Sequence, residues 1–299
     1  MTREEFLNKK YLEYRESHFG AHKTFFESPA SGSCEPFKIS DNIYYIGDKY
    51  VCIHMIDTGD GLVLIDAGYF NCEHIIMNSI WRLGFDPRDV KWIIHSHAHY
   101  DHFGASSEFK AMFGTRLAIS RVDYDSICEK PHRAHIDNVR FPYAKIPEFD
   151  KTLEDGEIFE LGNLKMRCVL TPGHTDGVMS FFFNTTYLGK EYIAATFGGA
   201  GVGAVTLPHL CYNERPYDVP DTMLKAIDSV IDEPVDFHLG NHPGNNNTFG
   251  RYDKMKKEGG NPFLDSNSWK NFLIELKKSV EMKKQENEAL EREMEKLGL

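Results

Sequence analysis

The chain has 299 residues, of which 34 are Lys or Arg and 45 are Asp or Glu, so its formal net charge is −11. A surface of this sign repels polyanions, which excludes a general nucleic-acid-binding role. Hydrophobic residues make up 41% and charged residues 26% of the chain, which excludes a disordered or fibrous protein.

Neither a signal peptide nor a membrane span is visible in the sequence. Residues 1–20 mix charges of both signs, and no stretch approaches the ~20 apolar residues that a membrane helix needs. The six cysteines form no CxxC pair, which fits free thiols in a reducing compartment. We therefore expect a cytoplasmic protein without a membrane or nucleic-acid partner.

Residues 1–33 form the first of three zones, an N-terminal arm with a short helix and a Ser-, Gly- and Pro-rich end. The second zone, residues 34–267, begins with β-branched and aromatic runs that predict strands at 43–47, 51–57 and 62–68. Apolar residues at helical spacing then predict a helix over 72–84, and a strand over 90–96 follows.

A second series of elements follows in the same zone. The patterns predict strands at 165–171, 178–184 and 192–196, a helix over 221–232 and a strand at 235–240. Strands followed by helices in both halves predict an α/β fold built from layers.

Residues 268–299 form the third zone, a charged helix whose apolar residues recur at alternating steps of four and three. Lys283 and Asn287 occupy two positions of this apolar seam and weaken it. One interpretation is a coiled coil with a partner, such as a second copy of the chain. The other is a helix packed on its own domain.

The densest cluster of metal-binding residue types follows the predicted strand 90–96. His97, His99, Asp101 and His102 form the pattern HxHxDH. Imidazole and carboxylate groups are ligands that zinc accepts, and alternate residues at a strand end point to the same side. We therefore expect this short segment to supply ligands for two metal ions.

Two further histidines each follow a strand-like run and are surrounded by turn residues. His174 lies in LTPGHTDG and His242 lies in GNHPGNN. Turn residues hold a side chain at the end of a strand, so we expect both histidines to reach the same edge of the fold.

Together these motifs resemble those of the metallo-β-lactamase superfamily, over about residues 36 to 257. The resemblance implies an αββα sandwich, in which two mixed β-sheets are flanked by helices and a metal site lies at the edge of the sheets. It also implies two zinc ions, one held by His97, His99 and His174 and the other by Asp101, His102 and His242.

Many branches of this superfamily carry a further Asp that bridges the metals, after the strand that here reads YIAAT. Residues 192–205 contain no carboxylate, so the chain is most similar to the third metallo-β-lactamase subclass. The lack of a visible export signal and the added C-terminal helix favour a cytosolic relative with another substrate.

The expected chemistry is hydrolysis. A water held between two cations becomes a hydroxide nucleophile near neutral pH, while a metal polarises the carbonyl that it attacks. We predict a binuclear zinc-dependent hydrolase of a small cyclic amide, lactone or ester, with Asp101 as the catalytic residue that orients the hydroxide. Two alternatives stay open: an iron-dependent redox enzyme on the same fold, and a noncatalytic, metal-stabilised interaction protein that assembles through the C-terminal helix.

The remaining candidates surround this set. Asp66 resembles a family position that supports the metal loop through hydrogen bonds, although a turn-forming Asp before Gly68 fits equally well. Tyr100 is a candidate contact for a small-molecule substrate, and residues 130–147 and 198–217 are expected to shape the groove. His95 is expected to be buried. Six histidines lack ligand-like neighbours and are left out of the site: His54, His74, His132, His135, His209 and His238.

Overall fold

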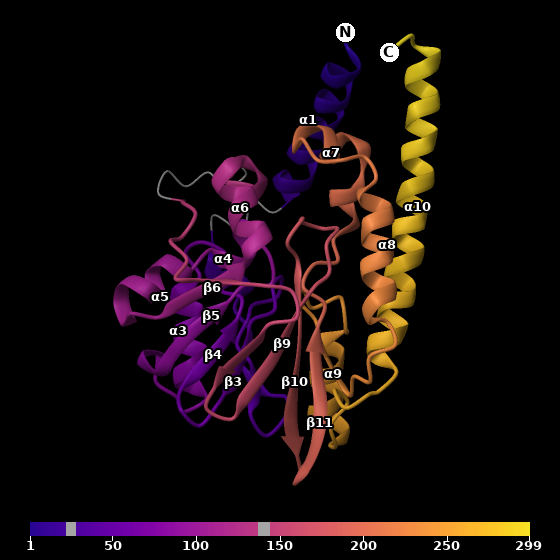
Figure 1. Ribbon diagram of the computed structural model, residues 1–299. Coiled ribbons are helices and arrows are strands. Elements are labelled where there is room, and N and C mark those ends of the chain that lie inside the picture. The colour runs from indigo at the N-terminus through magenta and orange to yellow at the C-terminus, as the bar shows by residue number, and fades with distance from the viewer. Residues whose placement is uncertain (22–27, 137–143) are drawn as a thin grey trace.

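The computed structural model describes residues 1–21, 28–136 and 144–299. Two β-sheets lie face to face, and helices cover both outer faces (Figure 1). This is the αββα sandwich that the sequence predicts. No helix in the described ranges combines the length and the apolar character that crossing a membrane requires.

The first sheet has seven strands that lie side by side in chain order. They are β1 (Phe37–Lys38), β2 (Ile43–Tyr45), β3 (His54–Asp57), β4 (Leu62–Ile65), β5 (Val90–Ile94), β6 (Arg116–Ser120) and β7 (Lys151–Leu153). The first four run antiparallel, and β4 to β7 run parallel. Parallel neighbours need crossover connections, which here contain helices α3 (Glu73–Arg82), α4 (Tyr100–Phe103), α5 (Ser106–Phe113) and α6 (Arg121–Glu129).

The second sheet has five strands in the order β12-β11-β10-β9-β8. β8 (Ile158–Leu161), β9 (Leu164–Leu170), β10 (Met179–Tyr187) and β11 (Lys190–Thr196) form an antiparallel meander. β12 (Phe237–Leu239) pairs parallel with β11, after α7 (Leu207–Tyr212) and α8 (Val219–Val230). Helices α9 (Thr248–Glu258) and α10 (Ser268–Lys296) complete the chain.

Strand periodicity decides which side chains meet between the sheets. In β10, Phe181 and Phe183 point into the core between the sheets, whereas Phe182 points outward and contacts the ring of Trp269 on α10. Successive side chains of a strand face opposite sides, so one aromatic run serves two layers. The inner core also holds Ile56 and Ile94 of the first sheet.

The long C-terminal helix packs on its own domain. Trp269, Leu273, Leu276 and Val280 of α10 are buried against α8 and the outer face of the second sheet. Asn287, which weakens the predicted seam, donates from Nδ2 to the Val205 carbonyl and accepts from the Leu207 amide at Oδ1, both at 2.9 Å. Most of the seam is therefore covered within this chain, whereas Leu297 at its end is 58% exposed.

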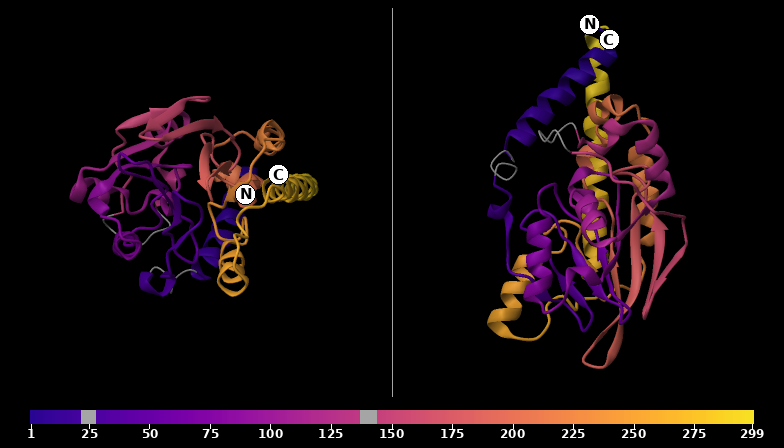
Figure 2. Two further views of the ribbon diagram at one scale, coloured as in Figure 1. Left: turned by 90° about the horizontal axis from the view of Figure 1, so that it is seen from below. Right: turned by 90° about the vertical axis from the view of Figure 1, so that its left-hand side faces the viewer.

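The two ends of the chain lie side by side (Figure 2). Helix α1 (Arg3–Ala21) has 19 residues, so the predicted short helix of the arm is in fact long. Leu7 is fully buried with Met294 of α10 and Leu207 of α7, and Lys10 pairs with Glu293 at 3.9 Å. The sequence prediction also omitted several elements, among them α5, β6, α6 and α9; the shorter ones give weak periodic signals.

Candidate metal centre

The loop between β5 and α4 carries the HxHxDH motif. His95 at its start is buried, and both of its ring nitrogens are occupied: Nδ1 by the Ala118 carbonyl at 2.8 Å and Nε2 by the Ser106 hydroxyl at 2.7 Å. This is the buried position that the sequence predicts for His95. The next side chains of the loop turn toward the edge between the sheets.

His97, His99 and His174 converge there. Each offers one ring nitrogen, and these atoms lie within 4.8 Å of one another. Nδ1 of His99 and Nε2 of His174 lie 3.0 Å apart. His174 comes from the loop between β9 and β10, so the second sheet completes a group that the first sheet begins.

A second group shares His97 with the first. It consists of His97, Asp101 and His102, whose ligand atoms also lie within 4.8 Å of one another. His242, which follows β12, places Nε2 3.7 Å from Oδ2 of Asp101. The structure thus gathers all six predicted ligands at one edge of the two sheets, and their binding of metal remains a prediction.

The histidine rings are oriented by hydrogen bonds on the side away from the site. Nδ1 of His97 lies 2.8 Å from the Gly198 carbonyl, and Nδ1 of His174 lies 2.8 Å from the Gly201 carbonyl. Nδ1 of His242 lies 2.7 Å from the Tyr50 carbonyl. Such contacts favour the tautomer in which Nδ1 carries the proton and Nε2 offers a lone pair, which is the form that binds a cation.

Two nitrogens that face the site support a cation there. Nε2 of His97 and Nε2 of His102 are buried and make no hydrogen bond with the described residues, although Nε2 of His102 faces Oδ2 of Asp101 at 3.4 Å. Buried polar atoms are nearly always satisfied in proteins, so such exceptions need an explanation. Imidazole and carboxylate donors fit zinc, and the residues present therefore suit a divalent cation.

The histidines of the site differ in their protonation state. Burial lowers the pKa of His97 and His99 well below the ordinary value and that of His174 to about 3, so these rings are neutral at pH 7. Burial opposes the charge on His102 too, but the carboxylates of Asp101 and Asp66 raise its pKa to about 10. A cation that binds at His102 therefore releases a proton.

Asp66 makes hydrogen bonds with the loop that carries the predicted ligands. It is 1% exposed and accepts three hydrogen bonds of 2.7 Å, from the amide and the hydroxyl of Ser96 and from Nδ1 of His102. Its φ is +66°, a left-handed conformation that Asp tolerates better than most residues. The hydrogen bonds are those that the family resemblance implies, whereas residues 66–68 form no turn.

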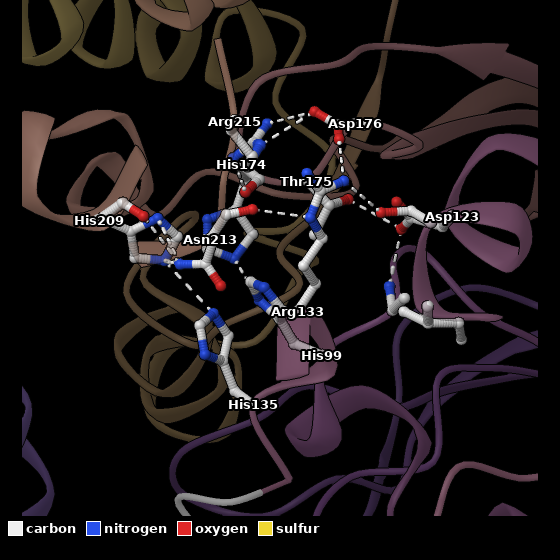
Figure 3. A pocket seen from close by; sticks show the side chains of 13 residues that line it. His99, Asp123, Arg133, His135, His174, Thr175, Asp176, His209, Asn213 and Arg215 are labelled. Atoms are coloured by element: carbon white, nitrogen blue, oxygen red, sulfur yellow. Dashed lines mark hydrogen bonds and ion pairs between the residues drawn. The ribbon is translucent and has the colours of Figure 1, made fainter. Parts of the chain in front are cut away.

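Two supporting residues were missed by the sequence analysis. Asp123 accepts from the Ala98 amide, the Thr175 hydroxyl and the Gly177 amide at 2.7 to 2.8 Å, and so ties the His97–His99 loop to the His174 loop (Figure 3). Arg215 donates to the carbonyls of Gly173 and His174 at 2.8 and 3.1 Å. Both act on backbone that is distant in sequence, and no local pattern marks such residues.

A pocket of about 380 Å³ opens over the site. Tyr100 lines it, as predicted, and so do Gly201 and His209 from the expected loop 198–217. Part of the other expected loop, residues 137–143, lies outside the described residues. Gly201 is required by close packing, because a Cβ there would lie 2.6 Å from Cε1 of His174.

The pocket also holds residues that the sequence analysis had set aside. His135 and His209, left out of the site for lack of ligand-like neighbours, both line it. The ring centroid of His135 lies 4.6 Å from that of His99. Helix α1 contributes Tyr11 and Tyr14, although this arm was not expected to reach the site. Only the tertiary fold brings residues so far apart in sequence to one wall.

Comparison with known proteins places this arrangement in a family. Residues 47–186 match the model described as "Metallo-beta-lactamase superfamily". Over this range the chain is similar to the metallo-β-lactamase superfamily. The native FEZ-1 metallo-β-lactamase from Legionella gormanii is 28% identical, with a TM-score of 0.77 over 86% of this chain and 98% of that one. The fold is that of metal-dependent hydrolases of this superfamily, the class predicted from the sequence.

Two more relatives define the range of similarity. BJP-1, a subclass B3 metallo-β-lactamase of Bradyrhizobium japonicum, has the same fold, with 24% identity and a TM-score of 0.75 over 87% of this chain and 97% of that one. An N-acyl homoserine lactonase from Bacillus thuringiensis is 25% identical over 166 residues, 47% of this chain and 60% of that protein. Matches to the first curated relatives thus span 31% to 60% of their lengths. The predicted likeness to the third subclass is confirmed at the level of the fold.

Proposed function

We propose that the chain is a binuclear zinc-dependent hydrolase that opens a small cyclic amide or lactone, or cleaves a small ester. The observation that carries the proposal is the pair of overlapping ligand groups, which share His97 and lie beneath a pocket of about 380 Å³. A structural zinc site usually closes with four ligands and lacks such an opening. The similarity to a lactonase and to β-lactamases supports a strained or activated carbonyl as the target.

Two bound divalent cations would lower the pKa of a water molecule and polarise the carbonyl of the substrate. The chain supplies the remaining functions. Oδ2 of Asp101 lies 3.4 Å from Nε2 of His102 and 3.7 Å from Nε2 of His242, at the centre of the second group. From there its carboxylate would orient the attacking water by accepting a hydrogen bond from it.

Metal content and hydrolysis, measured on one preparation, test the proposal. We expect about two zinc ions per chain and turnover of at least one lactone, β-lactam or activated ester, lost on chelation and restored by zinc. His97→Ala should lose both metals, since His97 belongs to both groups. His74→Ala, a change of an exposed histidine on α3, is the matched control and should keep metal and activity.

Other outcomes would overturn the proposal. Bound iron without hydrolysis of any compound in the screen would favour redox chemistry on this fold. A stable protein without bound metal and without hydrolysis would favour the noncatalytic interpretation.

A further inference from the structure

A glycine-rich loop carries the carbonyl that orients His174. Residues 198–203 read GGAGVG, so four of these six residues are glycine. The Gly201 carbonyl lies 2.8 Å from Nδ1 of His174 and also accepts from the Ala204 amide at 3.2 Å. Glycine has more backbone freedom than any other residue, so ordering this loop is costly. Contacts at the two ends of the loop must therefore hold the carbonyl in place.

The start of the loop is anchored at the metal centre itself. The Gly198 carbonyl accepts from Nδ2 of Asn241 at 2.7 Å and lies 2.8 Å from Nδ1 of His97. The other end of the loop runs into the short helix η5 (Val202–Val205), and Gly201 is the residue before that helix. The carbonyl beside His174 therefore moves with η5.

Asn287 of α10 holds the far end of η5. Its Nδ2 donates to the Val205 carbonyl and its Oδ1 accepts from the Leu207 amide, both at 2.9 Å. Leu207 is the first residue of α7, and the residue before it, Thr206, makes no side-chain hydrogen bond that caps this helix. The first amides of a helix need partners from outside the helix, so Asn287 caps α7 from α10.

The place of Asn287 in α10 supports a role beyond packing. It is 8% exposed and interrupts an apolar seam that includes Leu276 and Val280. A polar side chain in such a row costs stability unless its polar atoms are hydrogen-bonded. Both halves of the Asn287 amide are bonded, and both bonds go to the backbone that continues the glycine-rich loop.

We propose that Asn287 is a positioning residue of the metal centre: from the C-terminal helix it fixes η5, and through the Gly201 carbonyl it sets the ring of His174. The inference rests on the proposed function only where it assigns His174 to a zinc ion. Helix α10 is then part of the unit that holds the metal ligands, in addition to covering the second sheet.

Histidine-selective ¹⁵N labelling tests the positioning step in the metal-free chain. The ring resonances report which nitrogen of each histidine carries the proton and how fast that proton exchanges with water. His174→Gln identifies the resonances of His174. Asn287→Leu removes both contacts with a side chain of similar size, and Gln285→Leu, at an exposed residue of the same helix, is the matched control.

We expect the Nδ1 proton of His174 to exchange about three- to tenfold faster in Asn287→Leu, because its acceptor no longer has a fixed position. Asn287→Gln keeps a donor and an acceptor and should recover part of this change. Gln285→Leu should match the wild type. If Asn287→Leu does not fold, Asn287→Asp takes its place in the same comparison, since it keeps an acceptor for the Leu207 amide and loses the donor to Val205.

Two other histidines serve as references within the same spectrum. Nδ1 of His97 and Nδ1 of His242 face carbonyls that lie outside η5, so their exchange should stay at the wild-type rate in Asn287→Leu. Equal acceleration at all three rings would mean a general loosening of the fold and would overturn the positioning role. Wild-type exchange at His174 would overturn it as well.

Zinc affinity separates this inference from the proposed function. In competition with a chelator, Asn287→Leu should bind zinc about three- to tenfold more weakly at the position of His174, less than the loss of a direct partner causes, and normally at the other position. Wild-type affinity at both positions would overturn the role at the metal centre. The exchange measurement needs neither zinc nor turnover. A chain that hydrolysed none of the screened compounds would therefore count against the proposed function, while faster exchange confined to His174 would still support the positioning role.

Discussion

Replacement of Asp66 by Asn tests whether this carboxylate holds the metal loop in place. The change keeps the shape of the side chain, and Asn tolerates a φ of +66° about as well as Asp does. It replaces one acceptor oxygen with an NH₂ group. Asp66 now accepts from the Ser96 amide, the Ser96 hydroxyl and Nδ1 of His102, each at 2.7 Å. After the change, at least one of these buried donors faces another donor.

The cost follows from the buried position of these groups. A buried donor that loses its partner costs about 1–3 kcal/mol, so the free energy of unfolding of the metal-free chain should fall by about that amount. His102 would also lose the contact that fixes its ring, and loss of such a partner typically weakens metal binding about 10- to 100-fold. We therefore expect Asp66→Asn to lose affinity at the second metal position first, because His102 belongs to that group.

Competition with a chromophoric chelator measures both metal affinities, and urea unfolding of the metal-free chain measures the stability. Asp253→Asn, at an exposed carboxylate on α9, is the control and should match the wild type in both assays. If Asp66→Asn bound both zinc ions as tightly as the wild type and were equally stable, the reasoning would be refuted, because the three hydrogen bonds would then contribute neither to metal binding nor to stability.

The other predictions concern the first metal position, the pH dependence and the C-terminal helix. His174→Ala should lose one metal and lower turnover about 1,000-fold or more while circular dichroism stays unchanged; activity near the wild-type level would contradict its role. Burial raises the pKa of Asp48 from 3.8 to about 6, so its contribution stabilises the fold at low pH and is lost as the pH rises from 4 to 6. Asp48→Asn should remove this loss of stability. Relative to the wild type, the free energy of unfolding of the variant should increase by up to about 3 kcal/mol between pH 4 and 7, and pH profiles that run parallel would contradict the assignment. Trp269→Ala should cost about 3–5 kcal/mol in urea unfolding, because its fully buried ring joins α10 to the second sheet, whereas Met282→Ala, at an exposed position on the same helix, should cost little.

Much of the fold could be read from local patterns. The strands around Tyr45, Leu64 and Trp92 and the helix around Ile76 appear within a few residues of their predicted ranges. Each of these segments repeats its apolar residues at the period of its own structure, and burial of one face follows from that period. The elements that escaped prediction include α5, β6 and α6, which are short and occur between stronger signals, and α9, which has 11 residues. In such segments the packing of the neighbouring layers decides the conformation.

The sequence by itself determined the candidate ligands, because His97, His99, Asp101 and His102 occur in one short segment and their chemistry is local. It did not determine what surrounds them. Asp123, Arg215 and Tyr11 act across the sheets or from the far end of the chain, and no spacing in the sequence encodes such distances. Metal ligands are recognisable in a sequence because a cation binds only a few kinds of side-chain atom. A pocket wall can be built from many residue types in any part of the chain, provided that they give the right shape and hydrogen-bonding groups. Tertiary packing alone decides which residues come together there.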